Sequence, residues 1–163
     1  MTKASSTSEG SLLTGISTII FDIGSTLKHM QAWDWYDDAR PCLKRLSATH
    51  RLLVGANQPS LMLGYLEAGG MAQYFHHIYL SESIGYAKPD PQFFLHILGQ
   101  EGLNPTEVAM VGDELINDIA PANMLGMRSI WIKRGLGLEL AQTMDLEAKI
   151  KPDHVIRTLD ELR

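Results

Sequence analysis

Short apolar segments alternate along this chain with segments of helical pattern, and this alternation constrains the fold more than any other feature of the sequence. Each apolar segment is long enough only for a buried strand, and glycine, proline or polar residues separate it from the helix that follows. Strands that alternate with helices at this spacing favour right-handed βαβ crossovers and a parallel sheet covered on both faces. The sequence therefore predicts an α/β fold, a Rossmann-like three-layer αβα sandwich with a mainly parallel central sheet.

The expected elements can be assigned along the whole chain. The expected strands cover residues 16–21, 51–56, 78–80, 108–111, 128–132 and 154–156. One helix is expected to begin at Pro41, others cover residues 59–67, 91–100, 115–125 and 159–162, and residues 135–137 predict a loop. Residues 1–14 are rich in Ser and Thr, which predicts a flexible N-terminal tail. The remaining residues, 15–163, are expected to form one domain, because a chain of 163 residues with 45% hydrophobic residues can bury one substantial core.

Composition excludes several kinds of partner. The net charge of −5 at pH 7 gives no basic surface for a phosphodiester backbone, so no nucleic-acid partner is expected. The sequence has no apolar run of membrane-spanning length and no signal-peptide core, so no membrane partner is expected either. Cys42 is the only cysteine and is expected to pack as an apolar residue. These features predict a cytoplasmic protein that binds a small molecule.

Asp22 directly follows the first expected strand, and a turn follows it at Gly24 and Ser25. It should therefore lie at the carboxyl edge of the sheet, where open α/β folds bind their ligands. A carboxylate at that edge can attack phosphorus, hold a metal ion, or do both. An Asp after a strand can also simply cap a turn or a helix.

Two later segments strengthen the functional interpretation of Asp22. Lys88 lies in a Tyr-Ala-Lys-Pro-Asp turn before a helix, and Asp113 ends the fourth expected strand, with Asp118 in the helix behind it. Taken singly, each acid can be an ordinary cap or first-turn residue, and Lys88 can be a solvated loop lysine. Taken together, and placed after expected strand ends, these residues favour a metal or phosphate site.

In this order, the segments around Asp22, Lys88 and Asp113 resemble the haloacid dehalogenase (HAD) superfamily, whose members are mostly magnesium-dependent phosphohydrolases. The resemblance runs from about residue 16 to residue 162. It implies a Mg²⁺ cofactor and hydrolysis of a small phosphorylated metabolite, either a phosphomonoester or an acyl phosphate. The reaction would pass through an aspartyl-phosphate intermediate.

The resemblance also implies a role for each matching residue. Asp22 would be the nucleophile, and it would hold the metal together with the backbone carbonyl of Gly24 and the carboxylate of Asp113. Asp118 would bind the metal through water or orient the lysine. Lys88 would be catalytic and would bind substrate, because its charge neutralises the nucleophile and the phosphoryl group.

Two positions depart from the family pattern. Gly24 stands where the family usually has a second Asp, and loss of such an acid/base typically costs about 10²- to 10⁴-fold in rate. Ala56 stands where the family has a phosphate-binding Ser or Thr, so backbone N–H groups, including that of Asn57, are expected to bind the phosphate. One alternative is therefore a catalytically weak or inactive metal- or phosphate-binding module in protein interaction. A haloacid dehalogenase or a phosphonatase is a further alternative, ranked last.

The chain resembles a capless or minimally capped member of the family. The segment after Leu27 has room only for a small flap, and the segment between Asn57 and Ile78 only for one core helix and its connections. The flap carries an aromatic cluster that lines the site entrance, meets a partner subunit of a homo-oligomer, or packs on the neighbouring helix: Trp33, Trp35 and Tyr36. A separate pair, His76 and His77, is expected on the surface, because no other His or Cys completes a transition-metal set.

Overall fold

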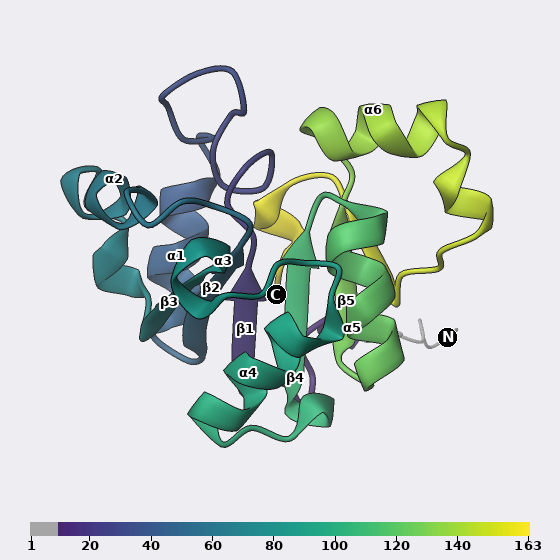
Figure 1. Cartoon of the computed structure of the whole chain (residues 1–163), viewed down its shortest axis with the longest axis horizontal. Coiled ribbons are helices and arrows are strands. Elements are labelled where there is room, and N and C mark those ends of the chain that lie inside the picture. The colour runs from purple at the N-terminus through teal and green to yellow at the C-terminus, as the bar shows by residue number, and fades with distance from the viewer. Residues whose placement is uncertain (1–9) are drawn as a thin grey trace, which may run out of the picture.

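The computed structural model describes residues 10–163, and its centre is one six-stranded sheet in the order β3-β2-β1-β4-β5-β6 (Figure 1). Every neighbouring pair of strands is parallel. The strands are β1 (Thr18–Phe21), β2 (Arg51–Ala56), β3 (His77–Leu80), β4 (Val108–Gly112), β5 (Arg128–Ile132) and β6 (His154–Ile156). The predicted Rossmann-like α/β fold is confirmed.

Helices and single helical turns connect the strands. The α-helices are α1 (Ala39–Ser47), α2 (Met62–Ala68), α3 (Ser81–Ile84), α4 (Pro91–Glu101), α5 (Ala120–Leu125) and α6 (Gly135–Thr143). The 3₁₀ turns are η1 (Ala72–Tyr74), η2 (Pro105–Glu107), η4 (Leu146–Ala148) and η5 (Leu159–Glu161), and η3 (Leu115–Ile119) is a π-helix. No helix within residues 10–163 combines the length and the apolar character that a membrane crossing requires.

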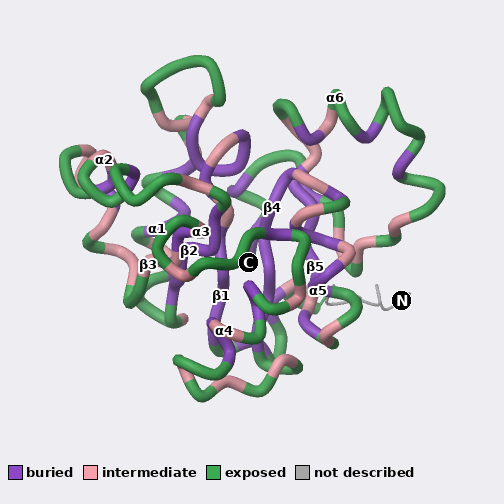
Figure 2. The backbone as a smooth tube through the Cα atoms, viewed as in Figure 1, coloured by how far each residue is buried: buried purple, intermediate pink, exposed green. Residues whose placement is uncertain are grey.

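Side-chain alternation along the strands gives the sheet an apolar surface on both faces. In β1, Ile19 and Phe21 pack into the cluster formed with α1 and α2, whereas Ile20 packs into the cluster formed with α4 and α5. Successive residues of a strand point to opposite faces, so a strand in a middle layer must be apolar at every position. Figure 2 accordingly shows buried strands inside exposed helices and loops.

The start of α4 shows how local sequence sets an element boundary. The Asp90 side chain accepts a hydrogen bond from the Gln92 N–H at 2.9 Å, and Pro91 occupies the first turn, where its missing N–H leaves no intrahelical bond unmade. Gly102 ends the helix in the left-handed conformation with φ of 65°. These boundaries place the turn that carries Lys88 directly before a rigid helix.

The strand order reverses between β1 and β4, which are neighbours in the sheet. The register pairs Phe21 with Val111, and the Asp22 N–H donates to the Val111 carbonyl at 3.0 Å. The chain therefore leaves β1 and β4 at adjacent points, with Asp22 and Asp113 as the first acidic residues beyond them. A crevice at such a reversal is the usual ligand site of open α/β sheets.

The prediction of a loop at residues 135–137 is wrong, because these residues begin helix α6. Glycine disfavours helix, but Gly135 and Gly137 lie in the first turn of α6, which other parts of the fold stabilise. The Leu136 N–H donates to Ser25 Oγ at 3.1 Å, and Ala141 is buried in a cluster with Trp131. These contacts come from distant segments, so the local sequence did not reveal them.

Two further boundaries differ from the expectation. The segment predicted as one helix at residues 115–125 begins with the π-turn η3 before α5 continues it. The predicted tail does not extend to Thr14, because Leu13 is buried in the core and Arg128 Nη1 donates to the Leu12 carbonyl at 3.1 Å. The rest of the predicted tail, residues 1–9, lies outside the described part of the chain.

The flap after β1 packs partly on α2, as one of the alternatives for its aromatic residues predicts. Trp35 stacks on Tyr65 at 5.2 Å between ring centroids, and Trp33 contacts the same ring but stays 74% exposed. Tyr36 stacks on the guanidinium of Arg134 at 3.7 Å and lines a cavity beside the flap.

Candidate active site

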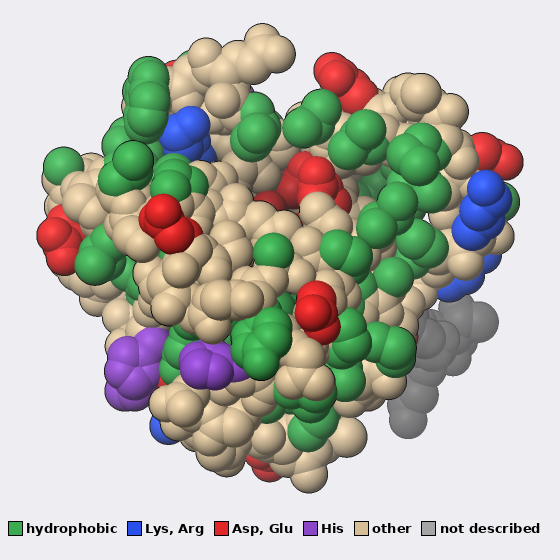
Figure 3. All heavy atoms as spheres, viewed as in Figure 1, with side chains coloured by type: hydrophobic (Ala, Val, Ile, Leu, Met, Phe, Trp, Pro, Cys, Tyr) green, Lys and Arg blue, Asp and Glu red, His purple; other side chains and the backbone are tan. Residues whose placement is uncertain are grey.

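Three carboxylates meet at the point where the strand order reverses. One oxygen from each of Asp22, Asp113 and Asp118 lies within 4.8 Å of the others. Asp22 follows β1, Asp113 follows β4, and Asp118 comes from η3. Figure 3 shows acidic side chains in a hollow between the flap and α6. The structure thus brings together the three acids that the sequence analysis selected.

Lys88 is the only cation within hydrogen-bond distance of this cluster among the described residues. Its Nζ donates to Asp118 Oδ1 at 2.6 Å, to Asp22 Oδ1 at 3.0 Å and to the Gly55 carbonyl at 2.8 Å. The side chain is 2% exposed. Burial alone would lower the pKa of Lys88, but the charges of Asp118 and Asp22 outweigh it and raise the pKa. Lys88 therefore stays charged at neutral pH.

Asn57 fixes the backbone of Lys88. Its Nδ2 donates to the Lys88 carbonyl at 2.8 Å, and its Oδ1 accepts from the Lys88 N–H at 2.8 Å. Both polar atoms of the side chain are engaged, so Asn57 holds the lysine turn against the end of β2. This positioning role was not foreseen, since the sequence analysis assigned only its backbone N–H to phosphate.

Thr26 joins two of the carboxylates. Its hydroxyl lies 3.2 Å from Asp22 Oδ2 and 3.2 Å from Asp113 Oδ1, so it donates its one hydrogen to either. The other oxygen of Asp113 accepts the Gly137 N–H at 2.9 Å. Burial, and then the charges of Asp22 and Asp118, raise the pKa of Asp113 well above its ordinary value.

Asp118 is the most enclosed of the three acids. Its side chain is 1% exposed, compared with 13% for Asp22. Burial raises the pKa of Asp118. The positive charge of Lys88 opposes that rise, and so does the Glu114 N–H, which donates to Asp118 Oδ2 at 3.0 Å. The π-turn of η3 brings the carboxylate back over Gly112, where a Cβ atom would collide with it. Glycine is therefore required before Asp113.

A cavity of about 160 Å³ opens onto the cluster. The predicted site residues that line it are Asp22, Gly24, Asn57, Lys88 and Asp113. Asp118 lies beneath the lining and reaches the site through Lys88. Ala56 is 1% exposed and packs in the core, so its side chain does not line this cavity.

Comparisons with known proteins agree with this geometry. The family model described as HAD-hydrolase-like matches residues 85–162. The chain is 31% identical over 131 residues to haloacid dehalogenase-like hydrolase domain-containing protein 3 from Danio rerio, covering 80% of this chain and 52% of that protein. The chain belongs to the haloacid dehalogenase-like (HAD) superfamily. A second HAD-type relative, glyceraldehyde 3-phosphate phosphatase from Pyrococcus furiosus, is 39% identical over 89 residues, covering 55% of this chain and 35% of that protein.

Solved HAD structures resemble the fold as well. The crystal structure of a HAD phosphatase from Thermococcus onnurineus superposes with a TM-score of 0.65 at 29% identity, covering 80% of this chain and 57% of that one. The chain spans about half the length, or less, of the curated relatives that it matches. The residues matched by the family model include Lys88, Asp113 and Asp118 but not Asp22.

The carboxylate cluster of this HAD chain has the donor atoms that Mg²⁺ prefers. Mg²⁺ takes oxygen ligands, and the three clustered groups offer carboxylate oxygens. Three carboxylates face the single ammonium group of Lys88, so the fully ionised set has an excess of negative charge in a buried place. Burial first, and then that repulsion, raise the pKa of Asp113, and a divalent cation would relieve the repulsion. The residues present fit the ion.

Met30 occupies the space beside Gly24, the position where most HAD enzymes have their second Asp. A Cβ atom built on Gly24 would collide with Met30 Sδ. Met30 comes from the flap, is 49% exposed and lines the same cavity as Asp22. A side chain at position 24 therefore requires the flexible side chain of Met30 to turn away.

Sequence reasoning did not identify three residues of the site, Thr26, Met30 and Gly137. Thr26 could have been identified from the sequence, because it lies four residues after Asp22 and its hydroxyl can donate to a carboxylate. Met30 and Gly137 gave no local signal, because each reaches the site only through tertiary packing.

Proposed function

We propose that this chain is a HAD phosphohydrolase that transfers the phosphoryl group of a small phosphorylated metabolite to Asp22 and then to water. One observation carries the proposal: the Asp22 carboxylate is the most exposed of the three acids and lines a cavity, while Lys88 donates to its Oδ1. A group that is both reachable and held by a buried cation is suited to act as nucleophile.

The reaction has two displacements at phosphorus. In the first, an Asp22 oxygen forms a bond to phosphorus as the bond to the leaving oxygen breaks. The products are an aspartyl-phosphate and either a carboxylate or an alkoxide, which takes a proton from water to give the alcohol. In the second, water attacks the same phosphorus, releases inorganic phosphate and restores Asp22. Lys88 keeps its charge throughout and offsets the negative charge gathered on the nucleophile and the phosphoryl oxygens.

Mg²⁺, held by Asp22, Asp113 and the Gly24 carbonyl with Asp118 behind them, would supply Lewis-acid stabilisation of the phosphoryl oxygens. The chain's own residues prepare that site. Thr26 and the Gly137 N–H orient Asp113, and Lys88 orients Asp22 and Asp118. Backbone N–H groups after β2, including that of Asn57, are proposed to bind the remaining phosphate oxygens.

The absence of a carboxylate at position 24 limits the leaving groups. Without a positioned acid, an alkoxide leaves slowly, whereas a carboxylate or an anomeric oxygen needs little protonation. Acyl phosphates and sugar 1-phosphates are therefore the substrates that this site favours. The names of two relatives, a glyceraldehyde 3-phosphate phosphatase and a phosphoserine phosphatase, support a small phosphorylated metabolite in general.

The test is phosphate release from a panel of acyl phosphates, sugar 1-phosphates and simple phosphomonoesters, with and without Mg²⁺. Wild-type protein is compared with Asp22→Asn and with Asp37→Asn, a matched change at an exposed aspartate of the flap. We expect release that requires both Mg²⁺ and Asp22 and that Asp37→Asn leaves unchanged. Equal activity in wild type and Asp22→Asn would refute the covalent mechanism.

The second candidate is a binding module that holds phosphate without turning it over. The observation that favours it is Met30, which fills the space beside Gly24 where a catalytic acid would stand. Orthovanadate binding in the presence of Mg²⁺, together with no phosphate release from any substrate, would support it. A haloacid dehalogenase or phosphonatase ranks last, and halide release from a 2-haloacid would be its test.

A further inference from the structure

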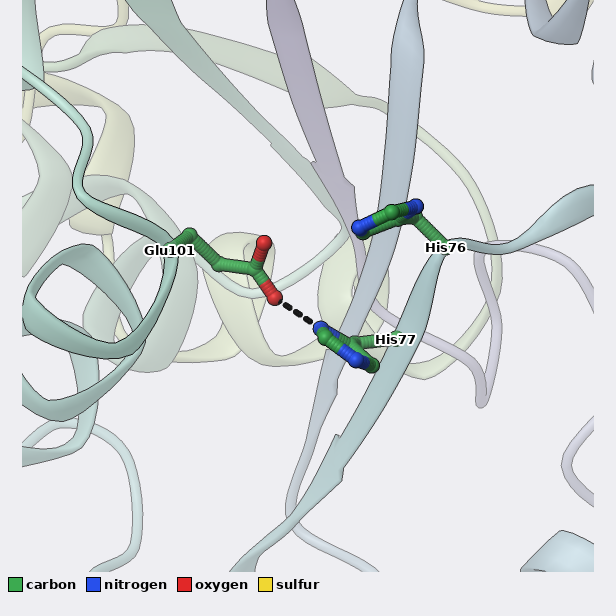
Figure 4. A group of neighbouring side chains, drawn as sticks. All are labelled: His76, His77 and Glu101. Carbon is green, nitrogen blue, oxygen red and sulfur yellow. Dashed lines mark hydrogen bonds and ion pairs between the residues drawn. The ribbon is translucent and has the colours of Figure 1, made fainter.

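A second group of metal-ligating side chains lies away from the active site, at the edge of the sheet formed by β3. His76 directly precedes β3, His77 is its first residue, and Glu101 is the last residue of α4 (Figure 4). One donor atom from each of the three lies within 4.8 Å of the others. The sequence analysis placed the two histidines on the surface, and both are exposed, but it did not find Glu101 as their third neighbour.

We propose that His76, His77 and Glu101 bind one divalent transition-metal ion, with Zn²⁺ as the best match, at a site separate from the acidic cluster of the active site. The inference does not depend on the proposed phosphohydrolase activity, because it uses different residues at a different edge of the sheet.

The carboxylate of Glu101 is already held in place. Its side chain is only 3% exposed, Tyr79 OH donates to Oε1 at 2.7 Å, and Arg51 Nη1 donates to Oε2 at 3.2 Å. Glu101 is therefore an oriented ligand, and outer hydrogen bonds of this kind are typical of protein metal sites.

The two imidazoles complete a donor set suited to Zn²⁺. Their ring centroids are 4.8 Å apart, and His77 Nδ1 pairs with Glu101 Oε1. Two nitrogens and one carboxylate oxygen match the ligands that zinc takes, whereas Mg²⁺ and Ca²⁺ prefer oxygen alone. Because the side chain of His77 is 59% exposed, an ion from solvent can reach the site.

An ion pair between His77 and Glu101 without a metal is the simpler alternative. The role of His76 distinguishes this ion pair from a metal site. The ion pair needs only His77 and Glu101, and His76 would then have no role. A metal site uses His76 as a third ligand and ties the segment before β3 to the end of α4. Since β3 lies at the edge of the sheet, such a tie would stabilise a strand that has a neighbour on one side only.

The experiment uses the full chain, freed of metal with a chelator and kept in excess Mg²⁺, and titrated with Zn²⁺ alone. The imidazole signals of all six histidines are followed by NMR, and thermal unfolding is measured with and without Zn²⁺. The variants are His76→Ala and the matched control His154→Ala, a change at a partly buried histidine of β6, at the opposite edge of the sheet and outside the ligand set. His76→Ala leaves the His77–Glu101 pair intact and does not touch the core, so it is expected to fold.

We expect Zn²⁺ to shift the ring signals of His76 and His77 and to raise the melting temperature of the wild type. His76→Ala should weaken Zn²⁺ binding at least about tenfold and abolish the thermal shift, as loss of a group that tunes a metal site costs roughly 10- to 100-fold in affinity. His154→Ala should change neither. An unchanged Zn²⁺ affinity in His76→Ala, unshifted rings of His76 and His77, or an equal loss in His154→Ala would overturn the proposal.

Discussion

Introducing an acid at position 24 should raise activity more when Met30 is removed as well. A side chain at position 24 starts with a Cβ atom, and that atom would collide with Met30 Sδ. In Gly24→Asp alone, the half-exposed side chain of Met30 must turn away, and it then competes with the new carboxylate for the cavity. In the double variant Gly24→Asp/Met30→Ala, the space is free and the carboxylate can face the leaving oxygen beside Asp22.

The expected size of the effect follows from the missing proton transfer. A positioned general acid is worth about 10²- to 10⁴-fold, so the double variant should gain up to about 10²-fold in kcat/KM on an alkyl phosphate. On an acyl phosphate, whose leaving group needs no proton, the gain should stay within about threefold. Gly24→Asp alone should gain much less on the alkyl phosphate than the double variant does.

The assay is initial-rate phosphate release at saturating Mg²⁺ for four proteins: wild type, Gly24→Asp, Met30→Ala and the double variant. The ratio of alkyl-phosphate to acyl-phosphate kcat/KM is the decisive quantity, because a general change in folding or metal binding alters both substrates alike. A double variant whose ratio equals that of Gly24→Asp would refute the steric role of Met30. A ratio unchanged from wild type in all variants would refute the acid role of position 24.

Three further predictions concern the core and the charges. Lys88→Met leaves the buried carboxylate of Asp118 and the partly exposed one of Asp22 without their partner, so it should remove activity and destabilise the fold by about 3–5 kcal/mol in urea titrations. Leu43→Ala in α1, at a side chain with 0% exposure, should cost about 2–5 kcal/mol, whereas the exposed control Leu63→Ala should stay within about 0.5 kcal/mol. Burial would raise the pKa of Glu101, but hydrogen bonds from His77 and Tyr79 outweigh it and lower the pKa in the folded protein. Glu101 therefore contributes stability that is present above its ordinary pKa of 4.5. This stability is lost as the pH falls through the lower pKa of the folded state. The stability difference between wild type and Glu101→Gln should therefore shrink in urea titrations below pH 4.5, and a constant difference would contradict this.

The fold was predictable because the central layer leaves little choice of residue. Strands covered on both faces are mostly apolar, and the segments at Arg51–Ala56, Arg128–Ile132 and His154–Ile156 agree with the observed β2, β5 and β6. Asp22 and Asp113 were predictable for a related reason, since each is the first acid after such a segment. Position relative to a strand end is information that the local sequence carries.

The parts that the sequence analysis missed depend on contacts between distant segments. Helix α6 forms on a glycine-rich segment because Ser25 and Asp113 accept its first N–H groups. Met30 meets Gly24 only because the flap folds back over the cavity. Glu101 meets the two histidines only because the end of α4 packs beside the start of β3. No local pattern encodes these distances.

In the proposed site, the residues at strand ends serve binding and nucleophilic attack, whereas the position next to the flap would serve protonation of the leaving group. The charge-bearing residues Asp22, Lys88 and Asp113 come from strand ends and a fixed turn, and burial and mutual hydrogen bonds hold them. Gly24, which departs from the family pattern, lies instead where the flap contacts the site. This departure leaves Asp22, Lys88 and Asp113 in place. Metal binding and attack by Asp22 need only the strand-end residues, whereas protonation of the leaving group needs position 24. Under the proposed mechanism, we therefore expect glycine at position 24 to narrow the leaving groups that the site can release and to leave the affinity for phosphate and metal unchanged.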